Sequence, residues 1–188
     1  MSTESEALFR LVDGLLPQAQ AFLEELCKIP SVSFPNYDPA EVLRSAEAVA
    51  TVFKQAGFPS VHVVRSDKYA PAVIAAWGQD PKQTTILLYA HHDVQPEMNQ
   101  SKWISPPFEP TVRDGRLYAR GAADDKAGIL VHATAAQALH QWAQINDTPC
   151  PNLRILIEGE EEVGSAGLAH LLAEHREFCK RIQPLWQI

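Results

Sequence analysis

The chain is poor in cysteine, and its three cysteines stand far apart. Cys27, Cys150 and Cys179 form no C-x-x-C pair. A chain of 188 residues can bury a hydrophobic core without disulfide staples. We therefore expect reduced thiols and a cytoplasmic location rather than a secreted disulfide framework. The first residues are polar and acidic, without the basic and apolar regions of a signal peptide.

Two further features are missing from the sequence. No stretch approaches the roughly 20 apolar residues that a membrane-spanning helix needs, so we expect no membrane contact. No lysine and arginine run is present and the net charge is −7, which argues against nucleic-acid binding. Hydrophobic residues make up 46% and charged residues 21% of the chain, as in ordinary globular proteins.

Local patterns predict alternating helices and strands. Apolar periodicity favours a helix over 5–28, in which Pro17 either makes a kink or begins a second helix. Asp38 and Pro39 are typical of a helix start, and that helix is expected to run to Ala56. The remaining predicted elements are strands at 61–64, 72–77, 85–90 and 153–158, a hairpin at 112–117, and helices at 125–144 and 165–180.

Strands that alternate with helices indicate an α/β fold, a largely parallel sheet flanked by helices. Ligands of such sheets bind beyond the carboxyl ends of the strands. Three short segments of unusual composition lie at or near such ends: 91–96, 121–126 and 158–165.

The first segment, 91–96, reads His-His-Asp-Val-Gln-Pro and follows an apolar strand. A neutral imidazole at His91 suits Zn²⁺. Asp93 lies two residues on, on the same side of an extended chain, where it can bond the other ring nitrogen and fix its orientation. The alternative is a strand-end histidine and a turn aspartate without special function. His92 points the other way and is expected to be structural.

The second segment, 121–126, reads Gly-Ala-Ala-Asp-Asp-Lys and precedes a helix. The carboxylate of Asp124 could bridge two cations, one on each oxygen. A helix cap is the alternative role for Asp124 or Asp125, and the doublet permits one ligand and one cap. Lys126 opposes the helix dipole, so we expect it to serve a local salt bridge or a backbone contact.

The third segment, 158–165, contains three consecutive glutamates after an apolar strand. A surface acidic loop is the ordinary explanation for such a run. Here a divalent cation would offset the repulsion between the carboxylates. One glutamate could then bind metal while its neighbour acts as a general base toward a metal-activated water. Four other histidines lie on predicted helices without paired ligand spacing and are expected to be structural or exposed: His132, His140, His170 and His175.

Together the three segments resemble the zinc aminoacylase, carboxypeptidase and dipeptidase family, whose members carry a two-zinc catalytic domain and a smaller lid domain. The resemblance rests on His-x-Asp-Val-Gln-Pro, Gly-x-Ala-Asp-Asp-Lys and Glu-Glu-x-Gly-Ser in the family's order and spacing, and it extends to about Lys180. The stretches 103–110 and 114–118 are most similar to the dipeptidase branch.

The resemblance implies a role for each site residue. His91 would bind one zinc, with Asp93 orienting it. Asp124 would bridge the two zincs, and the peptide bond between Asp124 and Asp125 would be cis. Glu161 would be the general base, and Glu162 would be a ligand of the second zinc. Mn²⁺ and Co²⁺ are also compatible with these ligands.

The end of the chain departs from the family pattern. A further ligand aspartate is expected about two dozen residues after the glutamate pair, but residues 181–188 contain none. We therefore expect 1–180 to be the N-terminal portion of the catalytic domain, with an incomplete ligand set, and 181–188 to be a divergent or truncated tail. We also expect the lid domain, through which family members often form homodimers, to be absent from this chain.

These expectations define the function to be tested. The sequence predicts a zinc-dependent metallopeptidase that hydrolyses dipeptides or short peptides with a metal-activated water, with low or no activity expected for this chain alone. One alternative is an N-acyl-amino-acid deacylase of the same family, which needs the same metals. The other is a non-catalytic metal-binding fragment.

Overall fold

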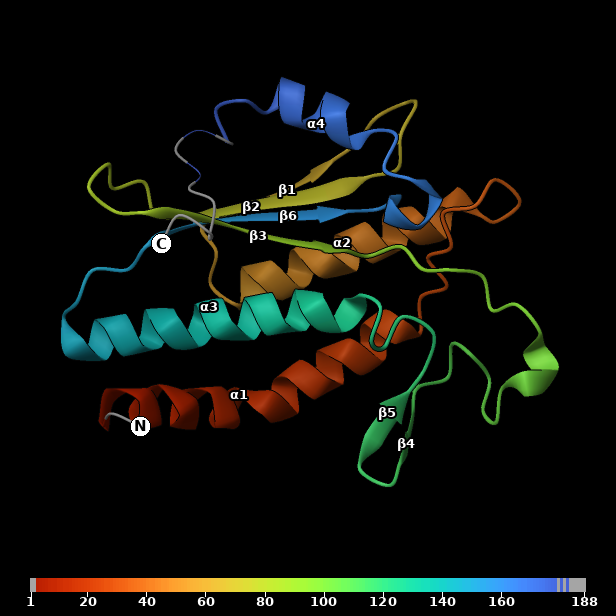
Figure 1. Ribbon diagram of the computed structural model, residues 1–188, viewed down its shortest axis with the longest axis horizontal. Coiled ribbons are helices and arrows are strands. Elements are labelled where there is room, and N and C mark those ends of the chain that lie inside the picture. The colour runs from red at the N-terminus through yellow and green to blue at the C-terminus, as the bar shows by residue number, and fades with distance from the viewer. Residues whose placement is uncertain (1–2, 179, 181, 183–188) are drawn as a thin grey trace.

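The computed structural model describes residues 3–178, 180 and 182 (Figure 1). The helices are α1 (Thr3–Cys27), α2 (Pro39–Gln55), α3 (Lys126–Asn146) and α4 (Leu168–Glu174), with short 3₁₀ turns at Gln100–Lys102 and Glu161–Val163. The strands are β1 (Ser60–Val64), β2 (Ala72–Trp77), β3 (Thr85–His91), β4 (Thr111–Arg113), β5 (Arg116–Tyr118) and β6 (Asn152–Glu158).

Four strands form the main sheet in the order β1-β2-β6-β3. The predicted α/β architecture is confirmed, but the expectation of largely parallel pairing was wrong for these strands. Among the four strands of this sheet that the structure describes, only β3 and β6 pair with each other in parallel, because α3 carries the chain back between them. β1 pairs antiparallel with β2, and β2 pairs antiparallel with β6. The short connection at 65–71 turns the chain directly from β1 into β2, which parallel pairing does not allow.

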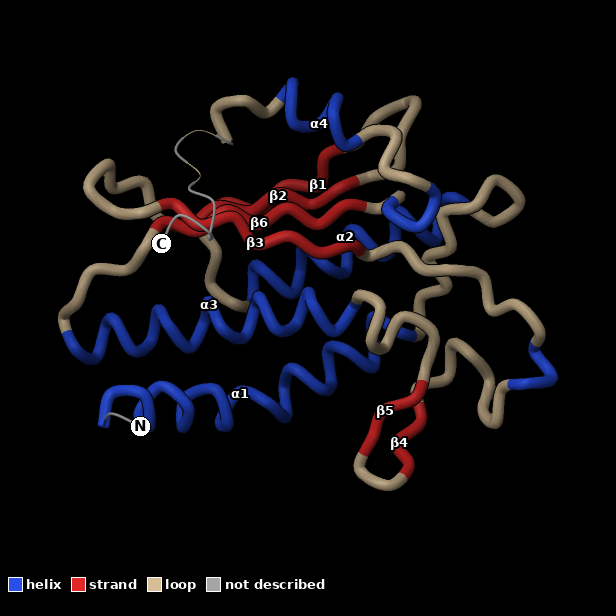
Figure 2. The backbone as a smooth tube through the Cα atoms, viewed as in Figure 1, coloured by secondary structure: helices blue, strands red, loops and turns tan. Residues whose placement is uncertain are grey.

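The core lies between the sheet and two helices. Figures 1 and 2 show α2 and α3 on one side of the sheet, α1 packed against α3, and α4 on the opposite side. Alternate residues of β6 enter this core, as a strand period of two requires. Fully or nearly fully buried side chains include Phe53, Ile129, Ile155 and Ile157.

Most predicted element positions are confirmed. α1 continues through Pro17 as one helix, so a second helix does not begin there. The carboxylate of Asp38 caps α2 by accepting the N–H of Ala40 at 2.9 Å. β4 and β5 form the predicted hairpin around 114–115. α4 is shorter than the helix predicted over 165–180. It begins only after Gly167 and ends at Glu174.

The fold brings the three chemical segments to one end of the molecule. His91 ends β3 beside Glu158, which ends the parallel neighbour β6, and the segment before α3 lies next to both. The predicted tail at 181–188 lies outside the described residues except for Ile182, which forms a parallel bridge with Thr85. Among the described helices, none is long and apolar enough to span a membrane.

Candidate metal centre

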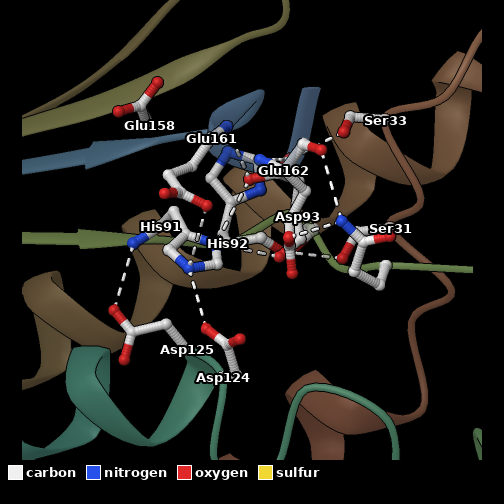
Figure 3. A network of polar contacts seen from close by, with 12 residues as sticks. Ser31, Ser33, His91, His92, Asp93, Asp124, Asp125, Glu158, Glu161 and Glu162 are labelled. Carbon is white, nitrogen blue, oxygen red and sulfur yellow. Dashed lines mark hydrogen bonds and ion pairs between the residues drawn. The ribbon is translucent and has the colours of Figure 1, made fainter. Parts of the chain in front are cut away.

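The imidazole of His91 is the centre of the polar network drawn in Figure 3. Its side chain is 7% exposed, and the dashed lines run from it to Asp124 and Glu161. Nε2 lies 3.1 Å from Oδ1 of Asp124 and 3.7 Å from Oε2 of Glu161. Nδ1 faces Asp93, at 3.1 Å from its carbonyl oxygen and 3.3 Å from Oδ1. Nε2 of His91 therefore faces the carboxylates that border solvent, and Nδ1 is held by the buried Asp93.

The electrostatics of His91 follow from these neighbours. Burial disfavours the charged imidazolium, but the hydrogen bonds to Asp93 and the charges of Asp93 and Glu161 outweigh it. The pKa of His91 is raised to about 9. The carboxylates that favour a proton on His91 would also favour a divalent cation at the same place, and such a cation would have to displace that proton.

Three of the predicted ligands come together. Ligand atoms of His91, Asp124 and Glu162 all lie within 4.8 Å of one another. One imidazole and two carboxylates form a donor set that suits zinc and other divalent transition metals. The carboxylate of Asp124 is 76% exposed, so the centre is open to solvent on that side. The residues present therefore fit a divalent cation.

Asp93 is fully buried and holds both the imidazole and the glutamate turn. Oδ1 accepts the backbone N–H of Glu161 at 3.2 Å, and Oδ2 accepts that of Glu162 at 3.1 Å. The hydroxyl of Ser33 donates to Oδ2 at 2.7 Å. Burial raises the pKa of Asp93, but the bonds from His91, Ser33 and Glu162 outweigh it and lower this pKa overall. Asp93 therefore remains a carboxylate.

The three consecutive glutamates turn to three different partners. Glu160 does not turn toward His91. Its carboxylate accepts hydrogen bonds from the backbone N–H groups of Ala70 and Gly167, which holds the segment that precedes α4. Glu161 turns toward His91. Glu162 accepts a hydrogen bond from Nε2 of Gln95 on Oε2 at 2.7 Å. This divergence relieves the repulsion that the sequence pattern implied.

Sequence reasoning missed the functions of Gln95, Ser33 and Glu160. The position of Gln95 inside the His-His-Asp-Val-Gln-Pro segment was a usable signal, because residues near ligands often orient them. Ser33 gave no signal, since it reaches Asp93 across 60 positions of the chain. Glu160 could not be separated from its two neighbours without the backbone geometry.

The segment before α3 differs in detail from the expectation. The Asp124–Asp125 peptide bond is cis, as the resemblance implied. Asp125 occupies the N-cap position of α3 but makes no capping hydrogen bond. Its Oδ2 instead accepts the backbone N–H of His91 at 3.4 Å. Lys126 makes the backbone contacts predicted as one of its two roles, donating to the carbonyls of Leu26 and Ile29 at 2.8 Å each.

Four of the other histidines have structural partners. His92 is fully buried, and its Nε2 lies 2.9 Å from the carbonyl oxygen of Pro71. His132 reaches the carbonyl oxygen of Tyr89 at 2.8 Å. His140 packs against the ring of Trp77, and His170 pairs with Glu174 along α4. These contacts agree with the structural or surface roles expected for them.

With this geometry established, comparison with known proteins identifies the family. Residues 87–185 match the sequence pattern of peptidase family M20/M25/M40, and this stretch contains all three chemical segments. The chain belongs to this family. The M20 peptidases are metal-dependent hydrolases, in agreement with the donor set found here.

Relatives within the M20 family are dipeptidases. The chain is 32% identical over 186 residues to the Cys-Gly metallodipeptidase dug1 of Schizosaccharomyces pombe, covering 94% of this chain and 38% of that protein. It is 37% identical over 107 residues to the human Beta-Ala-His dipeptidase, covering 57% of this chain and 20% of that protein.

Solved M20 structures agree with the fold. The dipeptidase Dug1p of Saccharomyces cerevisiae superposes with a TM-score of 0.83 at 25% identity, covering 97% of this chain and 40% of that one. Human carnosine dipeptidase 1 gives a TM-score of 0.80 at 28% identity, covering 94% of this chain and 39% of that one. The chain thus spans about two fifths of the length of these relatives' structures.

Proposed function

We propose that this chain carries the metal-binding and base-bearing part of a zinc dipeptidase that hydrolyses dipeptides or short peptides. The observation that carries the proposal is the cluster of His91, Asp124 and Glu162, with the carboxylate of Glu161 beside the same imidazole. The activities of the relatives, Cys-Gly and Beta-Ala-His dipeptide cleavage, support the substrate class.

Each site residue then has a proposed task. His91, Asp124 and Glu162 would hold the metal, with Zn²⁺ as the proposed metal and Mn²⁺ or Co²⁺ as alternatives. A bound cation of this kind polarises the scissile carbonyl and favours ionisation of a water. Asp93 holds His91 in the orientation that presents Nε2 to the cation.

Glu161 is the proposed general base. Its side chain is 43% exposed and lies on the solvent side of His91, where a water and a peptide can approach. The carboxylate takes a proton from the attacking water as oxygen bonds to the scissile carbonyl carbon. It then returns that proton to the leaving amine nitrogen as the carbon–nitrogen bond breaks. From a dipeptide the products are two amino acids, and the base is regenerated.

A specific observation also favours the non-catalytic alternative. Within 3–178, 180 and 182, His91, Asp124 and Glu162 form the single cluster of three metal-ligating side chains. Two catalytic zinc ions with three protein ligands each would require more donors than this cluster supplies. A chain that binds one cation without turnover is therefore the second candidate function.

One experiment separates these functions. The chain is incubated with Zn²⁺ or Mn²⁺ and a panel of dipeptides that includes Cys-Gly and β-Ala-His, with N-acetyl amino acids as a parallel panel. Bound metal is quantified in the same sample. Metal-dependent dipeptide cleavage supports the dipeptidase, whereas preferential cleavage of N-acetyl amino acids supports the deacylase. Bound metal without turnover supports the non-catalytic function, and the absence of bound metal contradicts all three.

A further inference from the structure

Gln95 holds Glu162 at two points. Its Nε2 donates to Oε2 of the Glu162 carboxylate at 2.7 Å and lies 3.3 Å from the backbone carbonyl oxygen of the same residue. The two residues are 67 positions apart in the chain, so the contact depends on the fold. A single amide group therefore ties the side chain of Glu162 to its own backbone.

The remaining backbone group of Glu162 is also held from the same segment. Its N–H donates to Oδ2 of Asp93 at 3.1 Å. Asp93 and Gln95 thus hold the N–H, the carbonyl oxygen and the carboxylate of Glu162 between them. A glutamate side chain otherwise rotates freely about three bonds, and ordering it costs conformational entropy.

The chemistry of an amide suits this task. A lysine at position 95 would neutralise the Glu162 carboxylate and compete with a cation for it. A second carboxylate there would repel it. The neutral amide of Gln95 orients the carboxylate and leaves its negative charge available to a metal ion.

We propose that Gln95 is a positioning residue of the metal centre, which acts by fixing the carboxylate of Glu162 before a cation binds. This inference rests on the proposed function, because it assigns Glu162 to a metal ion. It predicts that Gln95 sets the affinity for the cation through Glu162.

The test measures cation binding rather than activity. The full chain is titrated with Co²⁺ in competition with a chromophoric chelator, and the visible absorption of bound Co²⁺ is recorded. Gln95→Met keeps the length of the side chain and removes its donor. We expect it to weaken Co²⁺ binding about 10- to 100-fold, the range found when groups that orient metal ligands are lost. The absorption spectrum should change as well.

Gln100→Met provides the matched control. Gln100 lies in the same loop and donates to the Glu97 carboxylate at 3.2 Å, away from the cluster. This variant should bind Co²⁺ as the unmodified chain does. Gln95→Asn, which keeps the amide but withdraws it from Glu162, should resemble Gln95→Met, and binding like that of the unmodified chain by both Gln95 variants would overturn the proposal.

A double-mutant cycle tests whether the effect passes through Glu162. In a Glu162→Gln background, Gln95→Met should change Co²⁺ affinity much less than in the unmodified chain. In a Glu161→Gln background its effect should persist. An undiminished effect in the Glu162→Gln background would overturn the proposal while leaving the metal centre intact. Failure of the unmodified chain to bind Co²⁺ would instead contradict the proposed function, and this inference with it.

Discussion

The carboxylate of Asp93 accepts the backbone N–H of Glu161 at 3.2 Å, which joins the end of β3 to the turn that follows β6. The same carboxylate faces Nδ1 of His91. One buried charge therefore sets the position of the proposed base relative to the imidazole. The distance between the Glu161 carboxylate and the His91 imidazole depends on the pairing of β3 with β6, which places His91 opposite Glu158.

Asp93→Asn should lower the stability of the fold. The asparagine amide puts an NH₂ group where one carboxylate oxygen accepts hydrogen bonds, so at least one buried donor loses its acceptor. We expect the free energy of unfolding to fall by about 1–3 kcal/mol, measured by urea denaturation without added metal. Asp114→Asn, in the exposed turn between β4 and β5, should change it by less than about 0.5 kcal/mol. Equal effects of the two variants would contradict this role of Asp93.

Glu161→Gln and Glu162→Gln should separate catalysis from metal binding. Glu162 belongs to the ligand cluster, whereas Glu161 is proposed to move a proton. In a form of the protein that turns over dipeptides, Glu161→Gln should lower the rate by about 10²–10⁴-fold while Zn²⁺ binding persists. Glu162→Gln should weaken Zn²⁺ binding in a chelator competition assay. A Glu161→Gln variant with full activity would exclude it as the base.

Gly159→Ala should strain the turn that carries the glutamates. A β-carbon at Gly159 would lie 2.5 Å from the carbonyl oxygen of Pro71 and 2.7 Å from the ring of His92. These contacts can be relieved only by moving backbone or a fully buried ring, so we expect the free energy of unfolding to fall by about 1–3 kcal/mol.

Gly14→Ala is the matched control for this substitution. Gly14 lies inside α1, and a β-carbon there meets nothing within 4 Å. Alanine should therefore raise the free energy of unfolding by about 0.5–1 kcal/mol, because it favours the helix. Two substitutions of the same kind are thus expected to have opposite signs in urea denaturation. A neutral or stabilising result at Gly159 would show that the turn can move.

The sequence allowed prediction of those features that local chemistry decides. The cap at Asp38 and the ligand segment at His91 depend on residues close together in the chain, and both could be located without the structure. The strand directions could not, because antiparallel pairing of β2 with β6 depends on how distant segments meet. The contact between Gln95 and Glu162 was missed for the same reason.

The buried amine of Lys126 should make stability depend on pH. The side chain is fully buried, and burial lowers the pKa of Lys126 from 10.5 to about 8. Between pH 8 and 10.5 the unfolded chain therefore holds a proton that the folded chain has released. The unfolding free energy rises with pH in this window, by at most about 1.4 kcal/mol per pH unit. Below pH 8 the cost of burying the charged form is present in full.

Lys126→Met should remove this dependence. The variant loses the two hydrogen bonds to the carbonyl oxygens of Leu26 and Ile29, together with the titrating group. The stability of the unmodified chain relative to the variant should therefore increase between pH 8 and pH 10, as measured by urea denaturation at several pH values in that range. Lys54→Met, on the exposed side of α2, controls for the loss of a lysine charge and should show no such trend. A difference between the unmodified chain and Lys126→Met that stays constant with pH would mean that Lys126 remains charged where it is buried. In that case the carbonyl oxygens of Leu26 and Ile29 would stabilise the ammonium enough to offset its desolvation, because they are its hydrogen-bond acceptors at 2.8 Å.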